Sequence, residues 1–224
     1  MNAPFRLPRD DEHSLIVGRN GSGKTVGGWW QLSERSYPVR PWVVVDVKRD
    51  ELIGQTECIE IDVRARKMPR EPGLYVVRPH PNEIDELDDM FMRIWETEGI
   101  GTLVDEGYAI GNRNHGYRTL LMQGRSKRCP TITLSQRPLY LDRYAISEQS
   151  HYQVYDLNDR RDWAVLAEFT PIKGRDPHYG SDRHASLWYD VKSNSLHKLA
   201  PVPEPNAILE TFARRIPRRA QKWV

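Results

Sequence analysis

The sequence has few of the features that mark secreted, membrane-spanning or disulfide-built proteins. Its 224 residues include two cysteines, Cys58 and Cys129, and neither belongs to a Cys-x-x-Cys or Cys/His cluster. This pattern argues against a disulfide framework and against a zinc site, so we expect two reduced, structural thiols. No apolar stretch approaches the roughly 18 residues needed to cross a bilayer, and the N-terminus lacks the apolar centre of a signal peptide. We therefore expect a protein that neither spans a membrane nor is secreted.

Length and charge indicate one domain followed by a basic tail. A chain of 224 residues is long for a minimal domain and short for two full ones. The formal net charge is +2, but residues 206–224 hold five basic residues against Glu210 alone. We therefore predict a domain over residues 1–205 and a basic C-terminal tail over residues 206–224. Residues 113–143 form a second basic stretch, in which Asp142 is the one acidic residue.

The most specific motif is a glycine-rich loop that follows a short apolar run. Residues 14–17 suit a buried strand, and GRNGSGKT after them matches the phosphate-binding pattern GxxxxGK[ST]. Glycines let backbone N–H groups converge on one point at the start of the following helix. Lys24 would reach the β- and γ-phosphates, and the Thr25 hydroxyl would bind Mg2+. The motif predicts a site for a nucleoside triphosphate with Mg2+, formed by Gly18, Arg19, Asn20, Gly21, Ser22, Gly23, Lys24 and Thr25.

Strand-like and helix-like segments alternate along the chain. Buried-strand character is found in residues 41–47, 58–61, 74–77, 101–106, 131–136 and 152–157. Helical character is found in residues 25–35, 84–95, 115–127 and 160–169, and residues 185–199 favour a hairpin. The alternation predicts an α/β fold, with a mainly parallel sheet, helices on both faces and a C-terminal β-hairpin. Right-handed crossovers would bring the loops together at the carboxyl edge of the sheet, where ligands bind.

Two adjacent carboxylates, Asp105 and Glu106, follow the apolar run of residues 101–104. An acid at the end of a buried strand holds Mg2+ beside a phosphate loop, and a neighbouring acid can orient and deprotonate an attacking water. We assign Asp105 to the metal and Glu106 to the base. The pair argues against a nucleotide kinase, because a kinase has to exclude water rather than activate it.

Gln136 ends the strand that follows the acidic pair. Its amide would hydrogen-bond the γ-phosphate or the water and report hydrolysis to the rest of the molecule. The alternative interpretation is a turn residue at the end of a strand.

Four segments together resemble the FtsK/HerA superfamily of RecA-like, additional-strand, catalytic-glutamate (ASCE) P-loop ATPases, which pump DNA. The segments are GRNGSGKT, VVVDVKRDE, GTLVDE and GRSKRCPTITLSQRP. SQRP is the most specific of these elements, and Asp46 and Lys48 resemble the second-strand DpK element with Val47 in place of proline. The small size resembles the genome-packaging ATPases of membrane-containing icosahedral viruses and related phages. The resemblance implies an extra strand between the loop strand and the acidic strand, and a ring, usually a hexamer or pentamer, around double-stranded DNA.

The resemblance also implies that an arginine from the neighbouring subunit completes each site. Arg125 matches the arginine that precedes the SQRP strand, with Arg128 and Arg143 as competitors. Contacts to DNA would come from Arg113 and Arg118, in the segment after the acidic pair, unless that segment is simply an exposed loop. The basic tail would bind nucleic acid, dock on an acidic portal or capsid protein, or remain a solvated end.

These observations lead to one hypothesis with three alternatives. The hypothesis is an ATP-hydrolysing DNA translocase, the genome-packaging motor subunit of a virus or phage, located in the host cytoplasm or at the packaging vertex of the virion. The first alternative is a conjugation or DNA-repair ATPase of the same superfamily. The second is a nucleotide-gated assembly or morphogenesis protein that does not pump DNA, and the third is a small-molecule kinase.

Overall fold

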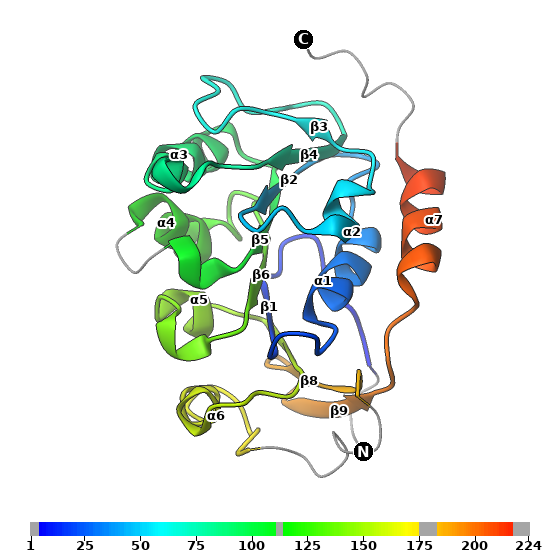
Figure 1. The fold of residues 1–224 in the computed structure, drawn as a ribbon. Coiled ribbons are helices and arrows are strands. Elements are labelled where there is room, and N and C mark those ends of the chain that lie inside the picture. The colour runs from blue at the N-terminus through cyan, green and yellow to red at the C-terminus, as the bar shows by residue number, and fades with distance from the viewer. Residues whose placement is uncertain (1–4, 111–113, 175–182, 217–224) are drawn as a thin grey trace.

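A computed structural model describes residues 5–110, 114–174 and 183–216. In this part of the chain one sheet of nine strands has the order β3-β4-β2-β5-β6-β1-β7-β8-β9 (Figure 1). β1 to β7 run parallel, and β8 and β9 extend the sheet as an antiparallel hairpin. The predicted α/β fold, with a mainly parallel sheet and a C-terminal hairpin, is confirmed. The strands are β1 (Ser14–Val17), β2 (Pro41–Asp46), β3 (Ile59–Glu60), β4 (Gly73–Val77), β5 (Gly101–Asp105), β6 (Thr131–Ser135), β7 (His151–Val154), β8 (Ser186–Asp190) and β9 (Ser195–Leu199).

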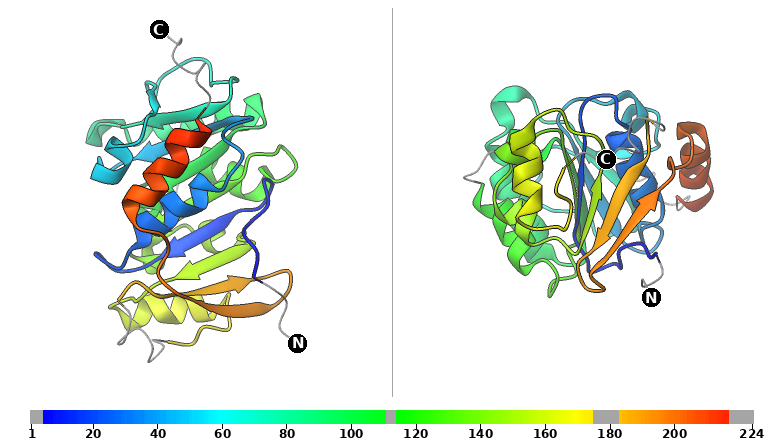
Figure 2. Two further views of the ribbon diagram at one scale, coloured as in Figure 1. Left: turned by 90° about the vertical axis from the view of Figure 1, so that its right-hand side faces the viewer. Right: turned by 90° about the horizontal axis from the view of Figure 1, so that it is seen from below.

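Helices cover both faces of the sheet (Figures 1 and 2). Side chains alternate between the two faces along β2, so the strand contributes to a hydrophobic core on each face. Val43 and Val45 pack with α3 (Glu86–Thr97) and α4 (His115–Gln123), whereas Trp42 and Val44 pack with α1 (Lys24–Ser33). None of the helices in the described ranges is long and apolar enough to cross a membrane. One face carries α1 (Lys24–Ser33), α2 (Glu51–Gly54) and α7 (Pro205–Arg215), and the other carries α3 (Glu86–Thr97), α4 (His115–Gln123), α5 (Tyr144–Ser147) and α6 (Arg160–Ala167).

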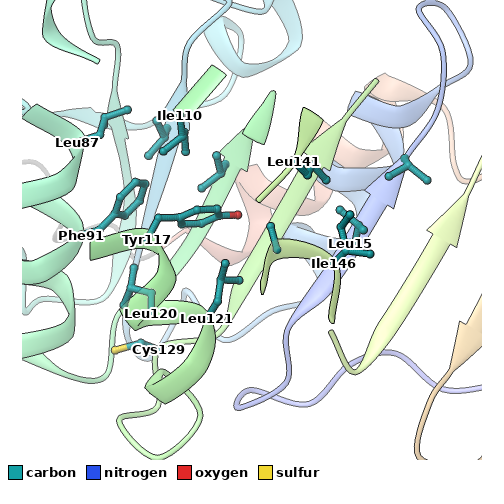
Figure 3. Close-up of a cluster of buried hydrophobic side chains, with 14 of the residues drawn as sticks. Leu15, Leu87, Phe91, Ile110, Tyr117, Leu120, Leu121, Cys129, Leu141 and Ile146 are labelled. Carbon is teal, nitrogen blue, oxygen red and sulfur yellow. The ribbon is translucent and has the colours of Figure 1, made fainter. Parts of the chain in front are cut away.

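The core beneath α3 and α4 is built around Tyr117 (Figure 3). Its ring lies against Phe91 of α3, with centroids 5.1 Å apart, and its hydroxyl hydrogen-bonds the hydroxyl of Thr133 on β6. Cys129 is buried in the same cluster, and burial raises the pKa of its thiol. Burial also raises the pKa of Cys58 to about 12. Both cysteines are free thiols.

Two adjacent glycines let α1 lie unusually close to the sheet. A Cβ atom on Gly28 would come within 2.7 Å of the side chain of Leu134 on β6, and one on Gly27 within 2.3 Å of the Tyr155 hydroxyl. A larger residue would therefore push the helix away from the strands. Trp29 is fully buried beside them in the core.

β6 lies between β1 and β5 and pairs in parallel with both. This is the extra strand that the resemblance to ASCE ATPases implies. The segments after β1, β5 and β6 therefore leave the sheet side by side at its carboxyl edge, which brings the glycine-rich loop, the acidic pair and Gln136 to one place.

The C-terminal segment differs from the expected basic tail. The predicted boundary between residues 205 and 206 falls inside α7, which lies across α1 (Figure 2). Ile208 and Phe212 are buried at a spacing of one helical turn, because they pack between α1 and the loop that follows it. The guanidinium of Arg215 donates to the carbonyl of Arg35 (3.1 Å). Residues 206–215 are thus part of the packed domain, and residues 217–224 lie outside the described residues.

Candidate nucleotide-binding site

The glycine-rich loop connects the end of β1 to the start of α1. The N–H of Gly18 donates to the carbonyl of Ser135, which ends β6 (3.2 Å). Gly21 and Gly23 have φ angles of 72° and 94°, left-handed conformations that glycine adopts without strain. α1 begins at Lys24 directly after this turn, so unpaired N–H groups and the positive end of the helix dipole lie at the loop. This is the arrangement that binds a phosphate group.

Asp156, which follows β7, holds Arg19 at the start of the loop. The N–H of Arg19 donates to the carbonyl of Asp156 (2.7 Å), and its guanidinium donates to the carboxylate of the same residue (3.1 Å). Asn20 is exposed, whereas Ser22 is buried. No role for Asp156 was predicted, because its distance from the loop depends on the pairing of β1 with β7.

The phosphate-loop lysine meets the acid that was assigned as the base. Nζ of Lys24 lies 2.9 Å from Oε1 of Glu106, and the two side chains are 6% and 0% exposed. An ion pair shielded from water in this way is screened much less than a pair on the surface. The predicted loop and the predicted base therefore form one polar centre.

Glu106 is oriented by its backbone and by donors from three residues, Lys24, Lys48 and Gln136. Its φ of 57° is left-handed, an uncommon conformation for a residue with a side chain. The amide of Gln136 donates to Oε1 of Glu106 (3.0 Å), and Lys48 also contacts this oxygen. Burial raises the pKa of Glu106, but the positive charge of Lys24 and the hydrogen bonds from Lys48, Lys24 and Gln136 outweigh burial and hold it below its usual range. The carboxylate is therefore ionised at neutral pH.

Asp105 has the properties of a cation ligand. It is fully buried, and neither carboxylate oxygen has a hydrogen-bond partner among the described residues. Burial raises its pKa to about 6, against the opposite effect of the nearby Lys24. A buried carboxylate without partners is costly unless a cation or a proton neutralises it. Mg2+ prefers carboxylate, hydroxyl and water oxygens, so Asp105 together with Thr25 in the first turn of α1 fits this ion.

Lys48 belongs to the site although no site role was predicted for it. It lies two residues beyond the end of β2, and its Nζ contacts Oε1 of Glu106. The pairing of Asp46 with Asp105 in neighbouring strands explains this contact, because it places the residues after β2 beside those after β5. The Asp-Val-Lys segment was the available signal in the sequence.

Arg125 lies away from the phosphate loop of its own chain. It is exposed in the turn between α4 and β6, at the amino edge of the sheet. Its charge contributes to the lowered pKa of His13, which precedes β1 at the same edge. Arg128 is exposed in the same turn, and Arg143 pairs with Glu168 on the surface (3.3 Å). Arg125 and Arg128 are therefore exposed and remote from the phosphate loop of their own chain.

Of the two arginines predicted to contact DNA, Arg118 lies in the described part of the chain. Nε of Arg118 lies 2.5 Å from the buried carboxylate of Asp142, and the guanidinium stacks over the ring of Tyr144. Its side chain is nevertheless 40% exposed. Arg113 lies outside the described residues.

A cavity of about 160 Å³ lies beside the start of α1. Gly23 and Val26 form one wall, and Tyr155 and His184 form another. The cavity is completed by residues 201–205, which connect β9 to α7 and include three prolines (Figure 1). Mostly apolar walls next to a phosphate site are what an aromatic base requires.

Taken together, these features define an ASCE P-loop NTPase. The phosphate loop follows β1, the acidic pair lies at the end of β5, and Gln136 follows the inserted strand β6.

No model of a known protein family matches the sequence. The DNA packaging ATPase P9 of Enterobacteria phage PRD1 is 37% identical over 217 residues, which cover 93% of this chain and 95% of P9. The chain therefore belongs to the family of this phage packaging ATPase, within the FtsK/HerA superfamily that the sequence motifs indicate.

Solved structures of a viral packaging NTPase and of a conjugation coupling protein share the fold. The genome packaging NTPase B204 of Sulfolobus turreted icosahedral virus 2, solved with AMPPCP, has a TM-score of 0.64 at 14% identity, covering 87% of this chain and 100% of B204. The conjugation coupling protein TcpA of pCW3, solved with ATPgS, has a TM-score of 0.57 at 14% identity, covering 89% of this chain and 64% of TcpA. At these identities the likeness concerns the fold alone.

Proposed function

We propose that this protein hydrolyses ATP to move double-stranded DNA into a viral capsid. The observation that carries the proposal is the buried Glu106 carboxylate, bound by Lys24 of the phosphate loop and by Gln136. A water-activating acid next to a triphosphate cradle supports hydrolysis rather than phosphoryl transfer to a metabolite. Membership of a DNA packaging ATPase family supports DNA as the molecule that the protein moves.

In the proposed reaction the triphosphate lies on residues 18–25, with loop N–H groups and the Lys24 ammonium against its β- and γ-phosphates. Glu106 accepts a proton from a water molecule while the water oxygen forms a bond to the γ-phosphorus. The bond between that phosphorus and the β,γ-bridging oxygen breaks, giving ADP and inorganic phosphate. The amide of Gln136 orients the water or the γ-phosphate. Asp105 and Thr25 would hold Mg2+, which supplies neutralisation of phosphate charge when bound.

We assign the nucleoside to the cavity beside α1. The cavity touches Gly23 and Val26, so a base in it would lie next to phosphates held by the loop. Its proline and valine side chains offer apolar surfaces to the faces of a purine.

We further propose that subunits form a ring, hexameric or pentameric, in which Arg125 reaches the site of the neighbouring subunit. Its exposure and its distance from its own loop support this role. A guanidinium stabilises the charge of the transferred phosphoryl group. Adding Arg125→Ala subunits to the wild type tests it, since a loss of activity steeper than the mutant fraction indicates coupled subunits and a proportional loss indicates independent sites.

DNA contacts are assigned to Arg113 and Arg118, and the basic C-terminal residues are assigned to DNA or to an acidic portal or capsid protein. Positive side chains at these positions would bind phosphate groups without regard to sequence, as a motor requires. Such a protein would act in the host cytoplasm and at the packaging vertex of the virion.

The test is ATP hydrolysis measured with and without double-stranded DNA. Lys24→Ala and Glu106→Gln should each lower turnover roughly 100-fold or more, because one removes the phosphate ligand and the other the base. Glu106→Gln should still bind ATP. The exposed residues Lys67 and Glu71 provide the matched controls Lys67→Ala and Glu71→Gln, which should behave as wild type. Unchanged turnover in both site variants would rule out the catalytic assignment.

A further inference from the structure

Lys48 is a second cation on the proposed base, and it comes from a part of the fold that is remote from the phosphate loop. Its Nζ and that of Lys24 contact the same oxygen, Oε1 of Glu106. β2, which precedes Lys48, is separated from β1 by β5 and β6. The two lysines therefore approach one carboxylate from opposite sides of the β5–β6 pair.

The backbone around Lys48 is fixed by the buried carboxylate of Asp46. One carboxylate oxygen accepts the N–H of Asp50 (2.9 Å), and the other accepts Nε of Arg78 (3.1 Å). The intervening residue Arg49 has a φ of 57°. These restraints shape a tight turn that directs residue 48 toward the end of β5, so the contact with Glu106 is built into the local structure.

The two lysines differ in what else they can bind. In the proposed reaction Lys24 has phosphate oxygens as competing partners for its three N–H donors. Lys48 stands across two strands from the loop and has the Glu106 carboxylate as its ion-pair partner in the described structure. Its hold on Glu106 therefore does not compete with phosphate binding.

We propose that Lys48 is a positioning residue, which keeps the Glu106 carboxylate beside Gln136 while Lys24 binds phosphate. The inference rests on the proposed function, because it concerns the geometry of the proposed base. Losing this restraint would let a buried carboxylate rotate away from the water, and misplacing a catalytic group by about 1 Å can lower turnover by about 100-fold.

The experiment compares Lys48→Met with Lys48→Arg and with the control Lys67→Met, which removes an exposed lysine outside the site. Lys48→Met should lower kcat by up to about 100-fold and leave KM for ATP and the thermal unfolding midpoint close to wild type. Lys48→Arg keeps the positive charge and should restore much of the lost kcat, whereas Lys67→Met, at an exposed lysine outside the site, should match wild type. A kcat unchanged by Lys48→Met, or a rise in KM with kcat unchanged, would overturn the positioning role.

Combining substitutions separates this inference from the proposed function. In a Glu106→Gln background, Lys48→Met should cause no further loss of kcat, because the group it positions is already gone. Additive losses would show that Lys48 acts elsewhere. If Lys48→Met does not fold, Lys48→Arg and Lys48→Gln carry the same comparison. Full turnover in Glu106→Gln alone would instead refute the proposed base, whatever Lys48 does.

Discussion

Lys24 and Glu106 meet at 2.9 Å although 82 residues separate them in the sequence. Lys24 belongs to the phosphate loop after β1 and Glu106 directly follows β5, and β6 lies between these strands. The contact therefore spans the end of β6, where Gln136 joins it. This centre forms only when β1, β5 and β6 pair in this register, so the geometry of the site depends on correct assembly of the sheet.

The cavity beside α1 predicts a separation between recognition of the base and of the phosphates. Val202→Trp should fill the cavity and weaken ATP binding roughly tenfold or more, while affinity for inorganic tripolyphosphate stays unchanged. Titration calorimetry with both ligands measures this. Val39→Trp, at a residue 74% exposed outside the cavity, is the matched control. Equal weakening of both ligands would place the base elsewhere, and Lys24→Ala should weaken both.

Close packing of α1 predicts that Gly28 does not tolerate a methyl group. Gly28→Ala would bring a Cβ within 2.7 Å of Leu134 and should lower the free energy of unfolding by about 1–3 kcal/mol through overpacking. Gly54→Ala in α2 meets no atom within 4 Å and should be neutral or stabilising by up to about 1 kcal/mol. Urea denaturation of the two variants checks the contrast, and equal effects would show that the helix has room to shift.

Burial of His13 predicts a loss of stability in acid. The N–H of Thr131 donates to Nδ1 of His13 (2.9 Å), and burial lowers the pKa of this histidine from 6.5 to about 3. Between these values the unfolded chain binds a proton that the folded chain does not, so stability falls as pH falls, by up to about 1.4 kcal/mol per pH unit.

Replacing His13 by asparagine tests this prediction, because an amide oxygen can accept the same hydrogen bond but does not titrate. Unfolding free energies at about pH 7.5 and about pH 5 should differ less in His13→Asn than in the wild type. Part of the difference should persist, since burial also lowers the pKa of His151. An unaltered pH dependence would assign the effect to other groups.

Packing of α7 predicts that the C-terminal helix stabilises the domain. The ring of Phe212 lies 5.5 Å from that of Trp29 and 5.3 Å from that of Tyr37, centroid to centroid. Phe212→Ala should therefore cost about 3–5 kcal/mol of unfolding free energy. Leu209, on the same helix but only half-buried, gives the control Leu209→Ala with a smaller expected loss. Equal small losses would mean that α7 contributes little to stability.

The parallel core could be predicted because its strands are short, continuous apolar runs. Residues 14–17 form β1 as expected, since Gly18 ends the run and starts the loop. β7 ends at Val154, whereas the sequence predicts a strand as far as residue 157. The chain leaves the sheet there because Tyr155 packs against α1 and Asp156 holds Arg19. Such long-range partners leave no periodic signal.

The departures at α7 and Lys48 have separate physical causes. The five basic residues beyond residue 205 predict a basic tail, whereas the one-turn spacing of Ile208 and Phe212 marks a buried helix face. The contact of Lys48 depends on which residues of β2 and β5 stand opposite each other. Strand register is a property of the assembled sheet, whereas the phosphate loop and the acidic pair are local patterns.

α1 is bound to the sheet by buried hydrogen bonds of Gln31 as well as by close packing at its glycines. Gln31 accepts a hydrogen bond from Ser14 on β1 (2.9 Å) and donates one to Gln153 on β7 (2.8 Å), within the core. A helix held in this way acts mechanically as a fixed support, because rolling or sliding would break buried hydrogen bonds. Motion driven by the nucleotide would then be taken up by the connecting segments at the carboxyl edge of the sheet, and the phosphate loop would serve as its stationary reference point.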